Sequence, residues 1–301
     1  MIICSLLLSA QLNEPTVSHV LTIGLIIVLG IPHGATDHVL DHFEQTGSYA
    51  TRFSAVFIGI YLLLIASYSL VWWLLPLPAL LLFLLISAYH FGQTQLFNLF
   101  SGTGLYVRLA YLSWGTVLLC SLFSLHYADT AQYLEGIVVL ADIPHVQTVL
   151  LGIMGIAILA YIGTLAVEWQ NKAFRKAASL HLVELGALVI LFSQLNLLLS
   201  FSLFFGLWHS TDAFKLQLKT IRTRYELSTA KLIRAAVPFS LLSLIGIGGL
   251  ISAYMVFPAL LSPFTLLFIL ISLLTLPHVV VVERFYKSGL ATPPPAATGP
   301  E

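Results

Sequence analysis

Residues 79–97 read ALLLFLLISAYHFGQTQLF, an apolar run that carries a single histidine, His90, in its second half. A helix needs about 20 mostly apolar residues to cross a bilayer, so this stretch is long enough to be a span. Similar runs follow one another along the chain, in which 58% of the 301 residues are hydrophobic and only 9% are charged. A water-soluble domain could not cover its surface with so few polar residues. The sequence therefore predicts an all-α, polytopic transmembrane helix bundle.

Polar breaks divide the apolar sequence into spans. The run from Ala177 to Ala213 is too long for one span and carries Gln194 and Asn196 near its middle, so we divide it there into a helical hairpin. Without that division the count is eight spans. With it, about nine spans are predicted, at residues 17–38, 54–75, 79–97, 106–126, 147–168, 179–196, 198–214, 233–256 and 261–283.

These spans leave little sequence for anything but one bundle. We expect residues 1–290 to form a single integral-membrane domain and the Pro/Ala-rich tail 291–301 to be disordered. Residues 1–12 lack the basic start of a signal peptide and are expected to lie at the membrane interface. Thirteen basic residues balance thirteen acidic ones, which leaves no broad positive surface for nucleic acid. Cys4 and Cys120 form no C-x-x-C motif, so redox chemistry through sulfur is not expected.

Basic residues predict the orientation in the membrane, because Lys and Arg accumulate in cytoplasmic loops. All thirteen fall on the same side when nine spans are drawn. The longest loop on the other side, residues 127–146, carries Asp129, Glu135 and Asp142 instead. The pattern predicts an N-terminus outside and a C-terminus in the cytoplasm, in a cell (inner) membrane.

Four of the ten histidines share one predicted depth. Each lies about five to seven residues before the cytoplasmic end of its span, which places it about 8–10 Å inside that boundary. Ionisable side chains at such depth are costly unless they face partners inside the bundle, and they commonly mark functional sites. Converging neutral imidazoles suit Fe(II), Zn(II) or Cu(II), whereas a purely structural hydrogen-bond layer is the alternative. The four are His33, His90, His209 and His278.

Other polar residues near these four histidines are candidates to support them. Carboxylates commonly orient a metal-binding imidazole through its second ring nitrogen. His38 and His42 lie at i and i+4 beside two aspartates, a spacing that metal pairs use, although their place at the interface favours a solvated role. The supporting candidates are Asp37, His38, Gln93, Asp212, Glu283 and, on a separate span, His181. By contrast, three histidines fall at the outer ends of spans and are expected to meet water: His19, His126 and His145.

Three motifs, in this order, resemble those of the Brp/Blh family of bacterial and archaeal membrane β-carotene dioxygenases. They are Pro32-His33-Gly34-Ala35 with Asp37, His90-Phe91-Gly92 and Trp208-His209-Ser210. The resemblance, which runs from the first span to the last, implies a membrane-embedded, non-haem Fe(2+) enzyme. Such an enzyme cleaves the central 15,15′ double bond of β-carotene with O2 to give two all-trans-retinal, often for a microbial rhodopsin. It implies that His33, His90 and His209 are iron ligands.

The chain departs from the family pattern at Ala213. A second histidine four residues after His209 usually supplies a fourth ligand in the family. Asp212 and His278 are the two candidates to replace it, and a diverged member that acts on another carotenoid stays open as an alternative. A polyene dissolved in the bilayer would need an apolar cleft lined by aromatic rings. The candidates for that lining are Phe91, Phe205 and Trp208.

Other functions fit the sequence less well. A transporter or proton relay would need polar residues that continue outward, but the outer half of the first span reads LTIGLII at residues 21–27. A membrane di-iron desaturase would need several clustered histidine boxes, and only His38 and His42 have such spacing. A non-catalytic partner of a rhodopsin is a further alternative, which the missing histidine at Ala213 favours.

Overall fold

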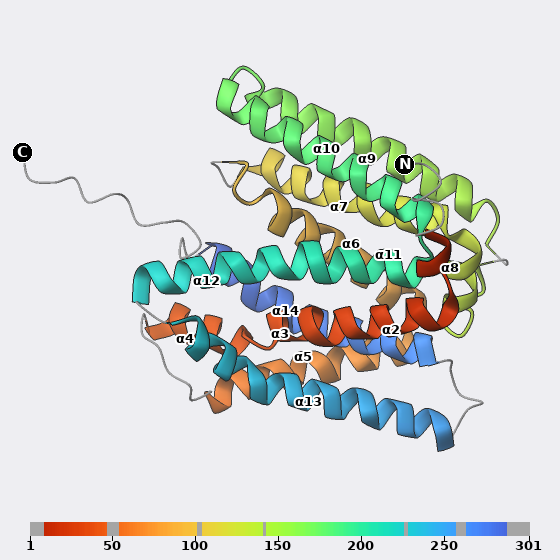
Figure 1. Ribbon diagram of the computed structural model, residues 1–301, viewed down its shortest axis with the longest axis vertical. Coiled ribbons are helices and arrows are strands. Elements are labelled where there is room, and N and C mark those ends of the chain that lie inside the picture. The colour runs from red at the N-terminus through yellow and green to blue at the C-terminus, as the bar shows by residue number, and fades with distance from the viewer. Residues whose placement is uncertain are drawn as a thin grey trace, which may run out of the picture.

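A computed structural model of the protein describes residues 9–46, 54–100, 104–140, 143–225, 228–256 and 263–287, and within these ranges every regular element is a helix (Figure 1). The all-α prediction is confirmed. The predicted disordered tail, residues 291–301, lies outside the described residues, as do residues 1–8 of the predicted interfacial start.

Within the described residues, eight helices are long and apolar enough to cross a membrane. Their bounds lie close to those predicted from the apolar runs. The first, Pro15–Phe43, is built from several consecutive segments. The others are α5 (Ala55–Leu74), α6 (Pro76–Leu96), α7 (Leu105–Leu125), α9 (Val146–Glu168), α10 (Lys172–Gln194), Thr229–Gly249 within α13 (Thr229–Val256), and Thr265–Lys287 within α14 (Pro263–Lys287). The short α8 (Tyr127–Leu134) begins the acidic loop.

A further helical stretch, residues 197–225, follows α10 and is more polar than these eight. It consists of α11 (Leu197–Leu203), the π-helical segment η3 (Phe204–Ser210) and α12 (Thr211–Tyr225), without a break. In Figure 1 it runs antiparallel to α10 as one long rod. The span predicted at residues 198–214 thus forms the first part of a longer helical stretch that continues with charged residues such as Lys215 and Lys219.

The hairpin between α10 and α11 is held by asparagines. Asn196 Oδ1 accepts a hydrogen bond from the Leu199 amide and so begins α11 (3.1 Å). Asn13, near the N-terminus, also contacts this turn. Its side chain donates to Gln194 O (2.8 Å) and accepts from the Asn196 amide (2.8 Å). Free backbone groups at helix ends need such partners where water is scarce. The helix therefore breaks where the polar residues Gln194 and Asn196 predicted.

The first membrane helix is interrupted rather than continuous. It contains α2 (Pro15–Leu25), the π-helical segment η1 (Ile26–Gly30), α3 (Ile31–Gly34) and α4 (Asp37–Thr46). Pro32 lacks an amide hydrogen and so cannot extend a regular helix through this point. Thr36 Oγ1 donates to His33 O (2.7 Å) at the step between α3 and α4. Short π-helical segments are frequent at functional sites, and this one ends three residues before His33.

Two glycines bring α6 and α7 into close backbone contact. A Cβ atom added at Gly92 would lie 1.8 Å from Tyr111 O, and one added at Gly115 would lie 1.8 Å from Ala88 O. Small residues at such positions allow membrane helices to pack backbone to backbone. Trp114, which is fully buried, fills the core beside this contact.

In Figure 1, α6, α7, α9 and α10 form one side of the bundle and α4, α5 and α13 the other. Helices α2, α11, α12 and α14 lie between the two groups in this view. Buried apolar clusters follow the same division, one around α6, α7, α9 and α10 and another around α4, α5, α13 and α14. The helices that carry the four predicted histidines meet at the centre of this arrangement.

Gly115→Ala is expected to lower the thermal unfolding midpoint of the protein in detergent, because the new methyl group overlaps the carbonyl of Ala88. Overpacking typically lowers the free energy of unfolding by about 1–3 kcal/mol. The carbonyl of Ala88 belongs to the backbone, so it cannot move aside as a flexible side chain can. Gly152→Ala is the matched control, since nothing lies within 4 Å of a Cβ added there. An unfolding midpoint of Gly115→Ala equal to that of the wild type would contradict the close contact.

Candidate metal centre

Four buried histidines from four different helical segments form a closed cycle of rings. The centroid distances are 5.2 Å for His33–His209, 4.8 Å for His209–His90, 5.1 Å for His90–His278 and 5.1 Å for His278–His33. Neighbouring rings are inclined by 76–89°, so each ring is nearly perpendicular to the next. The structure thus brings together all four histidines that share a predicted depth, from α3, α6, η3 and α14.

Several ring nitrogens in this cycle have no hydrogen-bond partner among the described residues. They are both nitrogens of His90, both nitrogens of His209 and Nε2 of His278. Leaving a buried polar atom unpaired costs about 1–3 kcal/mol, so these atoms need a partner that the protein itself does not supply. One ligand atom from each of His33, His90 and His278 lies within 4.8 Å of the other two. Neutral imidazole nitrogens are ligands for divalent transition metals, and this donor set fits such an ion.

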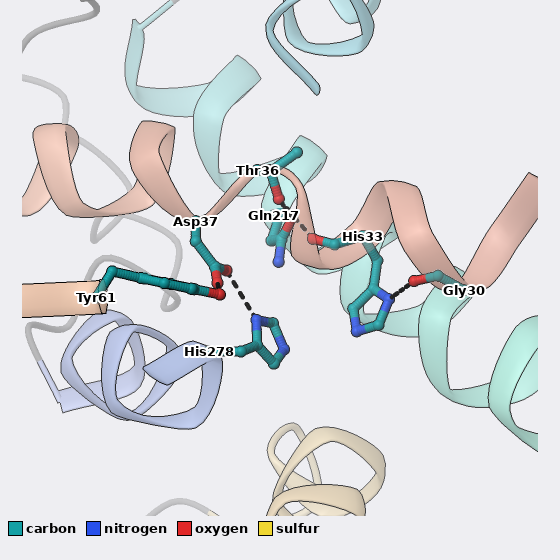
Figure 2. Close-up of polar contacts among 7 residues, drawn as sticks. All are labelled: Gly30, His33, Thr36, Asp37, Tyr61, Gln217 and His278. Atoms are coloured by element: carbon teal, nitrogen blue, oxygen red, sulfur yellow. Dashed lines mark hydrogen bonds and ion pairs between the residues drawn. The ribbon is translucent and has the colours of Figure 1, made fainter. Parts of the chain in front are cut away.

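The second nitrogen of two of these rings is fixed by the protein, as Figure 2 shows. His33 Nδ1 donates to Gly30 O (2.5 Å), and His278 Nδ1 donates to Asp37 Oδ1 (2.8 Å). Carbonyl and carboxylate oxygens only accept, so Nδ1 carries the proton in both rings when they are neutral and Nε2 keeps its lone pair. Metal-binding histidines commonly show this pattern, in which an outer acceptor fixes the tautomer and the ring orientation.

The two π-helical segments lie against each other and position His33 and His209. Ser210 Oγ donates to Phe205 O (2.6 Å), which gives the widened turn of η3 a hydrogen bond beside His209. A Cβ atom at Gly30 would lie 2.7 Å from Phe205 Cε1. Gly30 therefore leaves the space that the Phe205 ring occupies between η1 and η3.

Aromatic rings cover His209. Phe205 stacks on it with centroids 5.7 Å apart and an angle of 19°, and Phe91 meets it edge-on at 4.8 Å. Phe201 continues the stack on Phe205 at 5.5 Å. Trp208 is partly buried and packs against the core cluster that contains Phe204. These apolar groups exclude water from one side of the histidine cycle.

Of the predicted supporting residues near the cycle, Asp37 contacts it directly, through His278. Asp212 Oδ1 instead pairs with Lys215 Nζ (2.9 Å), and its side chain is partly exposed. Gln93 Nε2 donates to Glu283 Oε2 (2.6 Å), and Glu283 also pairs with Lys287 Nζ (2.9 Å).

The remaining two histidine candidates lie in other surroundings. His38 is buried rather than solvated, and its ring packs on Phe239 with centroids 4.5 Å apart. His181 Nδ1 pairs with Glu184 Oε2 on the same helix (3.1 Å).

Two polar residues at the site were not identified from the sequence. Tyr61, on α5, donates its hydroxyl proton to Asp37 Oδ2 (3.1 Å). Gln217 Oε1, on α12, lies 2.8 Å from Thr36 Oγ1 and shares the one hydroxyl proton of Thr36 with His33 O. A buried carboxylate next to a histidine predicts that some further donor is present. No sequence pattern, however, indicates which of the neighbouring helices supplies it.

Residues 24–286 match the family of beta-carotene 15,15′-dioxygenases, a range that contains all four histidines. The chain belongs to this family. The beta-carotene 15,15′-dioxygenase family membership inferred from the three motifs is thereby confirmed.

Two curated proteins are similar to parts of this family member. One is named "Probable beta-carotene 15,15'-dioxygenase Blh" and comes from Halobacterium salinarum, with 34% identity over 86 residues, 29% of this chain and 25% of the relative. The other is named "Beta-carotene 15,15'-dioxygenase" and comes from the uncultured marine bacterium 66A03, with 37% identity over 73 residues, 24% of this chain and 26% of the relative. The matched segments thus span about a quarter of each curated relative. No solved structure is significantly similar to the chain.

Adding a divalent metal ion to metal-stripped protein is expected to raise its thermal unfolding midpoint, because the ion pairs with nitrogens that meet only in the folded state. At a free metal concentration 100 times Kd, the free energy of unfolding should rise by about 2.7 kcal/mol. His209→Ala should lose most of this gain. His126→Ala is the control, since His126 Nε2 forms a hydrogen bond with Phe192 O (2.9 Å), away from the cycle. Equal gains in wild type and His209→Ala would show that His209 is not a ligand of the bound metal.

Proposed function

We propose that this family member cleaves the central 15,15′ double bond of β-carotene with O2 to give two all-trans-retinal, using Fe(2+) held by His33, His90, His209 and His278. Each carbon of the broken double bond receives one oxygen atom of O2, so the reaction balances without an added reductant. The observation that carries the proposal is the buried cycle of imidazoles, in which both nitrogens of His90 and His209 and Nε2 of His278 have no hydrogen-bond partner among the described residues. Membership of the beta-carotene 15,15′-dioxygenase family supports the choice of substrate.

Bound iron supplies the binding and activation of O2. The protein's own part is to hold the imidazoles, to exclude water and to position the polyene. Phe91 and Phe205 flank His209 with apolar rings against which a conjugated chain can pack, and Trp208 extends this apolar wall. The double bond that lies next to the histidines is the one that reacts, so this packing sets the cleavage position.

His278 is the proposed fourth ligand in place of the histidine that the family pattern has at Ala213. Asp37 orients its Nδ1, and its Nε2 is buried without a hydrogen bond among the described residues. The other candidate, Asp212, is already paired with Lys215. The ligand set therefore takes one residue from each of four helices.

The proposal includes a topology of nine spans, with the N-terminus outside and the C-terminus in the cytoplasm of a cell inner membrane. Residues 197–225 supply the ninth span, since η3 carries His209 into the buried cycle alongside helices that are apolar enough to cross. Residues 1–290 then form one membrane domain. The lipid bilayer supplies β-carotene, and a microbial rhodopsin is a suitable acceptor for the retinal.

Cells that accumulate β-carotene and express this chain are expected to yield retinal, and the purified protein is expected to contain iron. His33→Ala and His90→Ala should lower retinal formation by more than about 100-fold. Removing a metal ligand should reduce activity more than removing a residue that only hydrogen-bonds to a ligand. His126→Ala, matched in chemistry, should keep both retinal and iron.

Retinal extraction and metal analysis separate the possible outcomes of this experiment. Bound iron without retinal would contradict the proposed substrate and would favour another carotenoid in its place. Absence of both iron and retinal from the folded wild type would favour a non-catalytic membrane protein and overturn the proposal.

The fourth ligand is tested by His278→Ala and Asp212→Asn. His278→Ala should lower iron content and retinal formation together, because it removes a ligand from the cycle. Asp212→Asn should change neither by more than about 2-fold, since an exposed ion pair contributes only about 0–1 kcal/mol. Loss of iron from Asp212→Asn with retention in His278→Ala would reverse the assignment.

A further inference from the structure

Asp37 is a carboxylate in the interior of the bundle, with only 3% of the residue exposed. Each of its oxygens accepts a hydrogen bond from a different helix (Figure 2): Oδ1 from His278 Nδ1 on α14, and Oδ2 from the Tyr61 hydroxyl on α5. A buried carboxylate is costly unless it is paired or hydrogen-bonded. The nearby Arg284 pairs instead with Asp41, one turn further along α4 (3.9 Å).

A carboxylate held through one oxygen can still rotate about its terminal torsion, which is broad and soft. A donor on the second oxygen fixes the plane of the group and hence the direction of the first oxygen. Since Oδ1 is the acceptor for His278 Nδ1, that direction sets how the imidazole ring points. Tyr61 is therefore placed to control the orientation of His278 through Asp37.

From this geometry we propose that Tyr61 is a positioning residue of the metal centre, which acts through Asp37 to hold His278 Nε2 toward the other three histidines. The proposal rests on the proposed function, because it requires that the cycle holds a metal ion. Asp37 follows His33 on the same interrupted helix, so the Tyr61 hydroxyl also ties α5 to the segment that supplies another ligand.

Tyr61 also lines a cleft between α5 and α14. The cleft has a cavity of about 40 Å³, and its walls include Ile60, Pro277 and Val281, with Asp41 and Arg284 also present. A water molecule needs roughly 10–15 Å³ of such space, so water fits here. If the hydroxyl is removed, a mobile water from the cleft can reach the vacated side of Asp37, but it does not fix the plane of the carboxylate. Loss of Tyr61 should thus weaken the metal centre without abolishing it.

The same helix offers a matched control in Tyr68. Its side chain is buried, and its hydroxyl donates to Ala79 O (2.7 Å), a bond that joins α5 to the first turn of α6, at the other end of that helix from His90. Tyr61→Phe and Tyr68→Phe each remove one hydroxyl and one hydrogen bond, so a purely structural role predicts similar effects for both variants.

The experiment compares the two variants of the full-length protein in detergent. Three quantities are measured: Fe(II) affinity by chelator competition, the visible absorption of the Co(II)-substituted protein, and kcat and KM for β-carotene. Tyr61→Phe should lower metal affinity about 10-fold, at the low end of the range for residues that orient a metal ligand. It should also shift the Co(II) bands and lower kcat with little change in KM. Tyr68→Phe should leave affinity and spectrum as in the wild type.

A double-mutant cycle tests whether the effect passes through His278. In a His278→Ala background, Tyr61→Phe should cause no further loss of metal affinity, because the ring that it orients is absent. A second loss of about 10-fold in that background would overturn the proposal.

The outcomes separate this inference from the proposed function. If the wild type binds metal and Tyr61→Phe keeps its affinity and its Co(II) spectrum, the positioning role is wrong, even where the unfolding midpoint falls. If the folded wild type binds no metal, the proposed metal centre itself fails.

Discussion

The histidine cycle places five ring nitrogens inside the bundle without a hydrogen-bond partner among the described residues. Both nitrogens of His90 and His209 lie buried in an apolar bundle, without hydrogen bonds among the described residues. Each such atom costs free energy that packing of the surrounding apolar side chains must outweigh. Packing alone would not favour bringing these rings together. A shared metal ion would offset this cost by pairing with the nitrogens. The hydrogen bonds and ring contacts around the histidines hold the rings in position for such an ion.

Each histidine is held by a different device. His90 lies on α6, whose backbone contacts α7 directly at Gly92 and Gly115, so the position of this side chain is fixed by its helix. Backbone and carboxylate acceptors orient His33 and His278, and stacked aromatic rings fix His209. The closely packed helices α6 and α7 thus fix the position of His90. Side-chain hydrogen bonds and ring packing orient the other three histidines relative to it.

The sequence predicted the helices and the shared depth of the four histidines, because both follow from the length and the rise of a transmembrane helix. It could not predict how each helix is rotated about its axis. Asp37 and Asp212 each lie a few residues after a histidine, yet Asp37 serves His278 from a distant part of the chain and Asp212 pairs with Lys215. The contributions of Tyr61 and Gln217 also depend on those rotations, and so do the contacts between the two π-helical segments.

This chain has Ala213 where the expected family pattern has a histidine, and that difference changes how a bound metal would couple to the fold. Two ligands four residues apart on one helix would share a backbone and leave α14 outside the centre. With His278 in the cycle, the proposed centre joins α3, α6, η3 and α14, and Asp37 links α14 to the helix that carries His33. Metal binding then opposes separation of any of these four segments. Because α14 also packs on α4, α5 and α6, the histidine cycle would connect two of the apolar clusters of the bundle through its proposed fourth ligand.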